Sequence, residues 1–339
     1  MHNDVIARDA AEICQRVNLD ALRDKTILVT GASGLLGTCF LATLAHLKQT
    51  GMPLQAGAQV RNEPAPHTAE ILRRGGFQYV RANLAVPEEC ALLPPADVII
   101  HAAGYAQPAI FMANPVATFQ LNTTATATLL QKLKPGGSFL CLSSSEIYSG
   151  LEKPFLSESD IGTTTPLHPR ACYIEGKRGG ETICNAYRAQ GVRAVSARLA
   201  LAYGPGTRKG DKRALNSFVE KALCQGKIEL LDAGEAVRTY CYVSDAVELM
   251  WQATLHGTQP VYNIGGHSTV TIGELARLVS QITGVPVSFP QQSAEVAGAP
   301  SEVRLDLTRA ETEFNKTRYV SLEEGLRATV GWQRHLYSA

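Results

Sequence analysis

The segment from residue 26 to residue 51 constrains the fold most strongly. A short apolar run, TILVT, is followed by the glycine turn TGASGLLG and then by an apolar stretch, FLATLAHLKQTG, that ends at Gly51. Strand, glycine turn and helix in this order place backbone N–H groups and the positive end of the helix dipole where a pyrophosphate can bind. The segment therefore predicts a dinucleotide site. The turn residues expected at the cofactor are Gly31, Ser33, Gly34, Leu35, Leu36 and Gly37.

Further apolar runs repeat the strand pattern along the chain. They are LQAGAQV (54–60), FQYV (77–80), ADVIIHAA (96–103), SFLCLSS (138–144) and RAVSARL (193–199), and helical stretches separate most of them. Strands that are apolar throughout and alternate with helices indicate a parallel sheet covered on both faces. The predicted fold class is α/β: a Rossmann-type doubly wound parallel sheet with a smaller C-terminal substrate-binding lobe.

The length of 339 residues suits one large domain or two coupled ones. Apolar spacings of three and four near the start predict that residues 1–24 form a helical N-terminal arm. Residues 25–203 are predicted to form the dinucleotide-binding domain. Residues 204–339 are predicted to form mainly the substrate lobe, with some segments returning to the first domain. In that lobe, Thr271 and Glu274 predict a capping box at a helix start.

Composition argues against several classes of function. The 32 Lys and Arg balance 31 Asp and Glu without any block of like charge, so we expect no nucleic-acid partner. The eight cysteines are scattered singly, and the eight histidines show no ligand spacing, so we expect a reducing, cytoplasmic location and no metal. No signal-peptide pattern and no apolar window of about 18 residues is present, so we expect no membrane partner.

The segment after the second predicted strand bears on the choice between NAD and NADP. An acidic residue there binds the ribose 2′-hydroxyl of NAD, whereas an arginine accepts the 2′-phosphate of NADP. Here AQVRNEPAP supplies Arg61, then Asn62 and Glu63. Arg61 favours NADP, but it can also be a solvated loop residue. The sequence therefore leaves the cofactor open as NAD or NADP.

A second group of motifs points to redox chemistry at a hydroxyl group. Tyr173 and Lys177 lie four residues apart in CYIEGKRGGETICNAY, so on a helix they share one face. A phenol with a pKa near 10 is a poor base at neutral pH, but a neighbouring ammonium and an oxidised nicotinamide favour the phenolate. The serine cluster 143–145 ends an apolar run 29 residues before Tyr173, counted from Ser144.

With HAAG at 101–104 and Asn122 added, the sequence resembles the extended short-chain dehydrogenase/reductase family, specifically its nucleotide-sugar epimerases, dehydratases and decarboxylases. The resemblance covers nearly the whole chain, since ARLALAYGPG (197–206), RTYCYVSDAVELM (238–250), VRLDLTRAETEF and VSLEEGLRATVGWQ also match family segments. It implies an enzyme with tightly bound NAD or NADP that modifies a nucleotide sugar through a 4-keto intermediate. It also implies a homodimer formed through the helices that carry Asn122 and Tyr173.

The resemblance assigns roles to individual residues. Ser144 would hydrogen-bond the sugar hydroxyl that is oxidised, Tyr173 would be the base, and Lys177 would assist it and hold the nicotinamide ribose. Asn83 stands where the family usually has an Asp at the adenine. The further cofactor contacts that the resemblance implies are Asn83, Leu84, Ala102, Ala103, Gly104 and Asn122. His101 closes an apolar strand without a partner in spacing, so we interpret it as a core or loop histidine.

The residues after Ser144 bear on the step that follows oxidation at C4. Family dehydratases have Thr-Asp-Glu there, and the Asp protonates the leaving hydroxyl; here the triplet is Ser144, Ser145 and Glu146. The missing acid weakens dehydration, because hydroxide leaves poorly unless protonated. Ser-Glu resembles the UDP-glucuronate decarboxylases, our preferred hypothesis. A 4-epimerase, a 4,6-dehydratase, an NADPH-dependent 4-keto reductase and a non-catalytic dinucleotide-binding regulator stay open.

Substrate contacts are the least defined part of the pattern. Leu201 replaces the family's usual Asn before the YGPG loop, so the diphosphate must be held by other residues. Arg238 and Arg304 are the candidates, because guanidinium groups match phosphate oxygens, although each can also form a surface ion pair. Tyr148 is predicted to flank the sugar.

Overall fold

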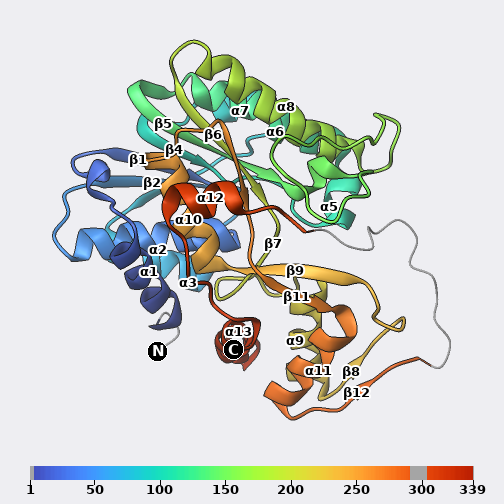
Figure 1. The fold of residues 1–339 in the computed structure, drawn as a ribbon. Helices are drawn as coiled ribbons and strands as arrows, with labels where there is room; N and C mark the ends of the chain where they lie inside the picture. Colours follow the sequence, from blue (N-terminus) through green and yellow to red (C-terminus); the bar gives the residue numbers. More distant parts are fainter. Residues whose placement is uncertain (1–3, 291–303, 339) are drawn as a thin grey trace.

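The computed structural model describes residues 4–290 and 304–338 (Figure 1). At its centre lies a seven-stranded sheet with the strand order β10-β6-β5-β4-β1-β2-β3, and every neighbouring pair is parallel. Its strands are β1 (Thr26–Thr30), β2 (Gln55–Val60), β3 (Gln78–Arg81), β4 (Ala96–His101), β5 (Leu133–Ser144), β6 (Arg193–Leu199) and β10 (Val261–Ile264). The predicted α/β fold with a parallel sheet is thereby confirmed.

Helices cover both faces of this sheet, as Figure 1 shows. One face carries α1 (Asp4–Arg16), α2 (Leu35–Gln49), α3 (Pro66–Gly75) and α10 (Val243–Leu255), and α12 (Thr308–Phe314) packs against α10 and β10. The other face carries α4 (Pro87–Ala91), α5 (Pro108–Ala113), α6 (Pro115–Asn122), α7 (Thr124–Leu130) and α8 (Ala171–Arg188). The strand order reverses between β1 and β4, which is where ligands bind in open α/β sheets.

A smaller group of elements lies beyond the carboxyl ends of the strands. It consists of β7 (Leu201–Tyr203), α9 (Ala214–Gln225), β8 (Ile228–Glu229), β9 (Val237–Tyr242), β11 (Ser268–Thr271), α11 (Ile272–Thr283), β12 (Val287–Ser288) and α13 (Leu322–Ser338). The capping box is confirmed: the Thr271 hydroxyl accepts from the Glu274 N–H at 3.0 Å, and the Glu274 carboxylate accepts from the Thr271 N–H at 2.8 Å.

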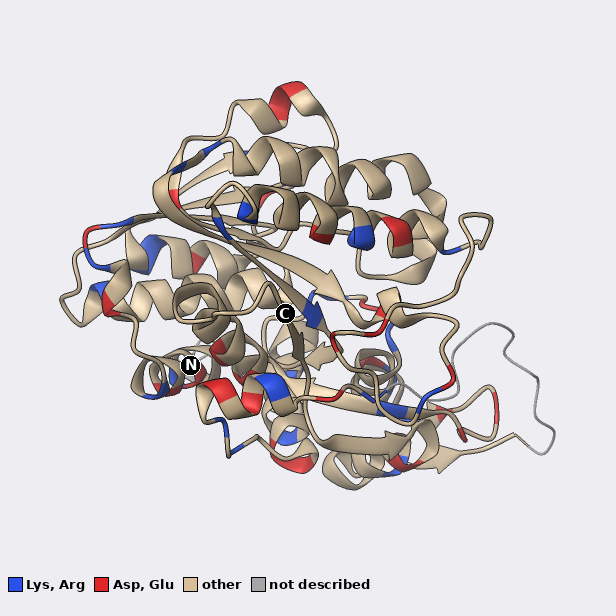
Figure 2. Ribbon diagram, turned by 45° about the horizontal axis from the view of Figure 1, so that its top comes forward, with Lys and Arg blue, Asp and Glu red and all other residues tan. Residues whose placement is uncertain are grey.

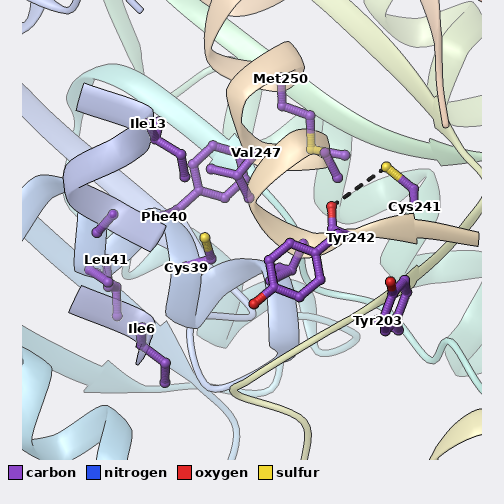
Figure 3. Packing of buried hydrophobic residues seen from close by; sticks show 14 of the residues in the cluster. Ile6, Ile13, Cys39, Phe40, Leu41, Tyr203, Cys241, Tyr242, Val247 and Met250 are labelled. Carbon is purple, nitrogen blue, oxygen red and sulfur yellow. Dashed lines mark hydrogen bonds between the residues drawn. The ribbon is translucent and has the colours of Figure 1, made fainter. Parts of the chain in front are cut away.

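The N-terminal arm packs into the main core (Figure 3). It consists of α1 and a 3-10 turn, η1 (Asp20–Leu22), and Ile6 and Ile13 of α1 are buried. The helix contacts α2 and α10, and the Tyr242 hydroxyl donates to Asp9 at 2.7 Å. The same apolar cluster extends through the sheet to Leu275 of α11. Because one core joins the arm, the sheet and the smaller lobe, the domain boundaries drawn from the sequence stay a prediction.

Strand β5 is longer than the predicted run 138–144, because it begins at Leu133. Its pairing with β4 shifts register between Ala96 and Val98, which marks a bulge, and Gly136 in the bulged stretch has φ +75°. A glycine accepts this left-handed conformation without a Cβ clash, so the strand can extend upstream of the run predicted from the sequence.

Charged residues of both signs are interspersed over the molecule (Figure 2). Within residues 4–290 and 304–338, no helix is long and apolar enough to span a membrane. The same ranges contain no group of three or more His, Cys, Asp or Glu side chains arranged to hold a metal ion. All eight cysteines are free thiols.

Candidate active site

The glycine turn joins β1 to α2 at the point where the strand order reverses. A Cβ on Gly31, whose φ is +64°, would lie 2.6 Å from the backbone of Ala102 and Ala103, and a Cβ on Gly37 would lie 2.5 Å from the Gly31 carbonyl oxygen. Gly34 caps α2 without a side-chain hydrogen bond, so the first N–H groups of the helix remain available to an anion. The turn thus fits the pyrophosphate of a dinucleotide.

The HAAG segment follows β4 beside this turn. The Ala103 N–H donates to the Thr30 hydroxyl at 3.3 Å, and a Cβ on Gly104 would lie 3.8 Å from the Lys177 ammonium. His101 is buried and uses both ring nitrogens, with the Thr30 hydroxyl at 2.9 Å and the Leu121 carbonyl at 3.0 Å. Burial lowers its pKa to about 4, so His101 is a neutral structural residue, as the sequence indicated.

Ser144, Tyr173 and Lys177 come together at the carboxyl end of β5. Ser144 is the last residue of β5, and its hydroxyl accepts from the Glu146 N–H at 3.2 Å at the start of η2 (Ser145–Tyr148). Tyr173 and Lys177 lie one turn apart on α8, with the ammonium 5.5 Å from the centre of the tyrosine ring. Lys177 donates to the Leu142 carbonyl at 2.5 Å, so the ammonium is fixed to the β5 backbone.

The electrostatics of this group depend on burial. Burial raises the pKa of Tyr173 to about 12, and its hydrogen bond with Ser144 and the charges of Arg213 and Arg170 act in the opposite direction. Burial also lowers the pKa of Lys177. In the protein alone the phenol is therefore neutral at pH 7, and a base at this position requires further positive charge close by.

Glu146 forms an ion pair with Arg170, which precedes α8. The pKa of Glu146 is raised by burial, while the charges of Arg170, His168 and Arg238 oppose that rise. Phe111 packs against both Tyr173 and Arg170. The centres of the stacked Phe111 and Tyr173 rings are 4.6 Å apart, and the Arg170 guanidinium lies 5.5 Å from the centre of the Phe111 ring. The carboxylate of Glu146 is thus held beside Tyr173.

Two arginines of this site were missed by sequence reasoning. Arg170 lies three residues before Tyr173, a helical spacing that could have identified it. Arg213 is bonded to Asp211 at 2.6 Å and acts electrostatically on both Tyr173 and Tyr240. It comes from the charged loop TRKGDKR, where nothing in the spacing separates a site residue from a solvated one.

The predicted substrate residues occupy different environments. Arg238 is the second residue of β9 and interacts electrostatically with Glu146 and Arg170. The Arg304 carbonyl accepts from the Leu156 N–H at 2.9 Å, which ties the C-terminal segment to the loop after η2. Tyr148 is 2% exposed, and its hydroxyl donates to Asn263 at 2.6 Å and accepts from Arg198 at 2.9 Å. Any role of Tyr148 at a sugar is therefore indirect.

The remaining predicted cofactor residues are spread along the same edge. Asn83 follows β3, and its side-chain oxygen accepts from the Ala85 N–H at 3.2 Å, while Leu84 is buried. Asn122 ends α6 and donates to the Thr118 carbonyl at 2.7 Å, against α8. Arg61 directly follows β2, donates to the Tyr105 hydroxyl at 2.5 Å and lies 5.2 Å from the centre of that ring.

A Rossmann-type sheet with Ser144, Tyr173 and Lys177 gathered at its carboxyl edge defines the class of short-chain dehydrogenases/reductases. The model of the NAD dependent epimerase/dehydratase family matches residues 27–265. The chain therefore belongs to this family of enzymes, and the family predicted from the sequence is confirmed.

Individual relatives agree with this assignment. UDP-glucuronic acid decarboxylase 1 of Xenopus tropicalis is 31% identical over 314 residues, which cover 91% of this chain and 72% of the relative. UDP-glucuronic acid decarboxylase 5 of Arabidopsis thaliana is 32% identical over 303 residues, 88% of this chain and 86% of the relative. A Thermotoga maritima UDP-glucose 4-epimerase structure with UDP-glucose superimposes with a TM-score of 0.76 at 26% identity, covering 92% of this chain and 99% of that one.

Proposed function

We propose that this protein modifies a nucleotide sugar by way of a 4-keto intermediate, and that its net reaction is the decarboxylation of UDP-glucuronate. Family membership and the names of the two decarboxylase relatives support the substrate class. Arginines 170, 213 and 238 around the site outnumber the carboxylates of Glu146 and Asp211, which favours a substrate with several negative charges.

The observation that carries the choice of reaction is the Ser144–Ser145–Glu146 turn with Glu146 ion-paired to Arg170 beside Tyr173. A dehydratase needs an acid to protonate the departing hydroxyl group, and Ser145 occupies the position of that acid. A decarboxylase needs none there, because carbon dioxide leaves as a neutral molecule. The turn therefore favours decarboxylation over dehydration.

The residues that would hold a nicotinamide dinucleotide are the glycine turn, the HAAG segment and Lys177, and their geometry fits it. The oxidised nicotinamide supplies a hydride acceptor for sugar C4 and a positive charge near Tyr173. We infer tight binding, and Arg61 at the end of β2 favours NADP over NAD.

Tyr173 takes the proton of the C4 hydroxyl group, and Ser144 hydrogen-bonds the same oxygen. The Lys177 ammonium, fixed to the Leu142 carbonyl, stabilises the phenolate from one helical turn away. With C4 as a ketone, the C6 carboxylate is β to a carbonyl group. The C5–C6 bond then breaks, carbon dioxide leaves, and the electron pair moves into the C4 carbonyl before C5 takes up a proton. C4 finally takes back the hydride and its oxygen takes back the proton from Tyr173, so that the net reaction is the loss of carbon dioxide alone. Glu146 and Arg170 either orient the carboxylated sugar or take part in the transfer of the proton to C5.

The proposal is tested by incubating the purified protein with UDP-, dTDP-, GDP- and CDP-sugars and measuring product mass. Loss of carbon dioxide from UDP-glucuronate is the expected result. Loss of water, or an isomer of unchanged mass, from another sugar nucleotide would replace decarboxylation by dehydration or epimerisation. No reaction and no change of nicotinamide absorbance with any substrate would indicate a regulator.

An NADPH-dependent 4-keto reductase is the second candidate. Arg61 favours it, because a reductase draws on the cellular NADPH pool whereas a decarboxylase returns its hydride to the sugar. A gain of two hydrogens by a 4-keto sugar nucleotide would identify this activity.

We further propose that the protein is a homodimer in the cytoplasm. Val116 is 70% exposed and Phe119 43% exposed on α6, and both line a shallow groove with Ala171 and Cys172 of the adjacent α8. A second copy packing there would cover this apolar surface. Light scattering at micromolar concentration should give twice the 36.4 kDa chain mass, and a particle of 36.4 kDa alone would contradict the dimer.

A further inference from the structure

Glu181 extends the row of functional side chains on α8. It lies four residues after Lys177, as Lys177 lies four residues after Tyr173, so the three side chains share one face of the helix. The Glu181 carboxylate accepts from the Ser143 hydroxyl at 2.5 Å, and Ser143 directly precedes Ser144 on β5. A carboxylate of the helix that carries Tyr173 therefore holds the strand that carries Ser144.

Arg198 of β6 binds both oxygens of this carboxylate. Its Nε donates to Glu181 Oε1 at 3.0 Å, and its Nη2 donates to Glu181 Oε2 at 2.8 Å. Arg198 is 6% exposed and Glu181 8% exposed, so water and salt screen the ion pair little. A pair with two parallel hydrogen bonds has a fixed planar geometry, and it therefore joins α8 rigidly to the sheet.

Arg198 lies in a row of polar residues that crosses three strands. In the parallel register, Ser143 of β5 is opposite Arg198 of β6, and Arg198 is opposite Asn263 of β10. Tyr148, the last residue of η2, joins this row: Nη1 of Arg198 donates to its hydroxyl at 2.9 Å, and the hydroxyl donates to Asn263 at 2.6 Å. Burial raises the pKa of Tyr148 to about 12, so the hydroxyl keeps the proton that it donates.

Ser143 and Tyr148, the two anchors, bracket the Ser144–Glu146 turn in the sequence. A third bond comes from α8, since the Arg178 guanidinium donates to the Ile147 carbonyl at 2.6 Å. The turn itself runs into η2, a 3-10 helix of four residues, and 3-10 hydrogen bonds have poorer geometry than those of an α-helix. The position of the turn therefore depends on the bonds that α8 and β6 make to its two ends.

We propose that the buried Arg198–Glu181 pair is a positioning pair for catalysis: through the two anchors it holds the Ser144–Glu146 turn opposite Tyr173. The proposal rests on the proposed function in one respect, that Ser144 and Tyr173 act on the same sugar hydroxyl. Transfer of a proton or a hydride requires the reacting atoms to be nearly in contact, and a misplacement of about 1 Å can lower the rate about a hundredfold. Neither member of the pair needs to touch the sugar to affect the rate.

The test uses variants of the anchors, because substitution of Arg198 or Glu181 leaves the other charge buried and unpaired and destabilises the fold. Tyr148→Phe and Ser143→Ala each remove one anchor hydroxyl and leave the ion pair in place. The matched control is Tyr262→Phe: Tyr262 is also buried, but its hydroxyl donates to Glu313 of α12 at 2.7 Å. Urea unfolding of each full-length variant checks that it is folded.

Hydrogen exchange over residues 143–149 measures whether the anchors hold the turn. Each anchor variant should exchange these amides about tenfold faster than the wild-type protein, because loss of an anchor lowers the free energy needed to open the turn. Tyr262→Phe should leave this exchange unchanged. Unchanged exchange in either anchor variant would overturn the proposal.

A kinetic cycle with Ser144→Ala separates positioning from general destabilisation. The rate of cofactor reduction is measured in a single turnover at saturating substrate. Each anchor variant should lower this rate about tenfold in the wild-type background and about twofold or less in the Ser144→Ala background, because the hydroxyl that the anchors position is already absent there. Equal factors in the two backgrounds would assign the anchors a structural role alone and would overturn the proposal.

These measurements distinguish the positioning pair from the proposed function. Cofactor reduction at C4 begins decarboxylation, epimerisation and dehydration alike, so a different net product leaves the kinetic cycle valid. Unchanged exchange in the anchor variants of a protein that decarboxylates UDP-glucuronate would refute the positioning pair alone. Faster exchange in the anchor variants of a protein that converts no sugar nucleotide would refute the proposed function alone.

Discussion

The cofactor end and the sugar end of the site are built in different ways. The cofactor end consists largely of backbone from one continuous turn, Gly31 to Gly37, supported by the neighbouring HAAG segment. The sugar end consists of charged and aromatic side chains from separate loops, such as Glu146, Arg170, Arg213 and Arg238. Geometry at the first end depends on the absence of Cβ atoms, and at the second on ion pairs across loops. A common cofactor can thus be retained while the sugar chemistry varies.

The largest expected effect is on proton transfer at Tyr173, which lies between the cofactor end and the sugar end of the site. Tyr173→Phe removes the proton acceptor and keeps the ring on Phe111, so turnover should fall about a hundredfold or more with the fold intact. Initial rates and circular dichroism measure this. The control is Tyr79→Phe, an exposed tyrosine bonded to Glu63, which should keep wild-type turnover. Near-normal turnover of Tyr173→Phe would exclude the proposed base.

The next effect separates the sugar end from the cofactor end. Glu146→Gln keeps the shape but cannot accept a proton or pair with Arg170. Dinucleotide binding and some formation of reduced cofactor should persist while net product is lost. Single-turnover nicotinamide absorbance, followed beside product mass, tests this. Glu175→Gln, which removes the negative charge paired with Arg178 within α8, is the matched control.

Other outcomes of that experiment have distinct meanings. If oxidation and substrate binding fall together, Glu146 only positions the sugar. If the isomer ratio approaches equilibrium more slowly without a trapped ketone, the enzyme is an epimerase. Wild-type rates of oxidation and product release would leave no role for Glu146.

A third variant perturbs the cofactor end alone. Gly31→Ala forces a Cβ to within 2.6 Å of the Ala102–Ala103 backbone at a φ of +64°, and should lower the free energy of unfolding by about 1–3 kcal/mol and abolish dinucleotide binding. Gly51→Ala is the control, because Gly51 also has a positive φ but has nothing within 4 Å of its added Cβ. Urea unfolding and dinucleotide titration should show a clearly larger loss for Gly31. Equal effects would refute the packing argument.

The smallest expected effect concerns cofactor choice. Arg61→Ala removes one guanidinium at the end of β2 and should weaken NADP(H) about tenfold while changing NAD(H) little. Dissociation constants for both cofactors measure this. An equal change for both, or none, would make Arg61 a solvent-exposed residue that only stacks on Tyr105.

The same contrast explains what the sequence could predict. The glycine turn, six of the seven strands of the central sheet (all but β10) and the Thr271–Glu274 capping box follow from local spacing, because backbone geometry there depends on neighbouring residues. Arg213 escaped notice, because the charged loop that carries it has no period that shows where its side chains point. Tyr148 illustrates the same limit: its hydroxyl is bonded to Asn263, which is 115 positions away in sequence. The early start of β5 was not predicted, because the strand passes through a bulge that contains a proline and two glycines, which usually interrupt strands.

The central claim is that oxidation at C4 precedes loss of the C6 carboxylate, and one single-turnover experiment tests it directly. UDP-glucuronate labelled with ¹³C at C6 is mixed with excess wild-type protein carrying oxidised cofactor, and nicotinamide absorbance and labelled carbon dioxide are followed together. The account predicts that absorbance of the reduced cofactor rises first and that labelled carbon dioxide then appears in equal amount to the sugar consumed. Retention of the label in the product, or its release without any change in absorbance, would contradict the account.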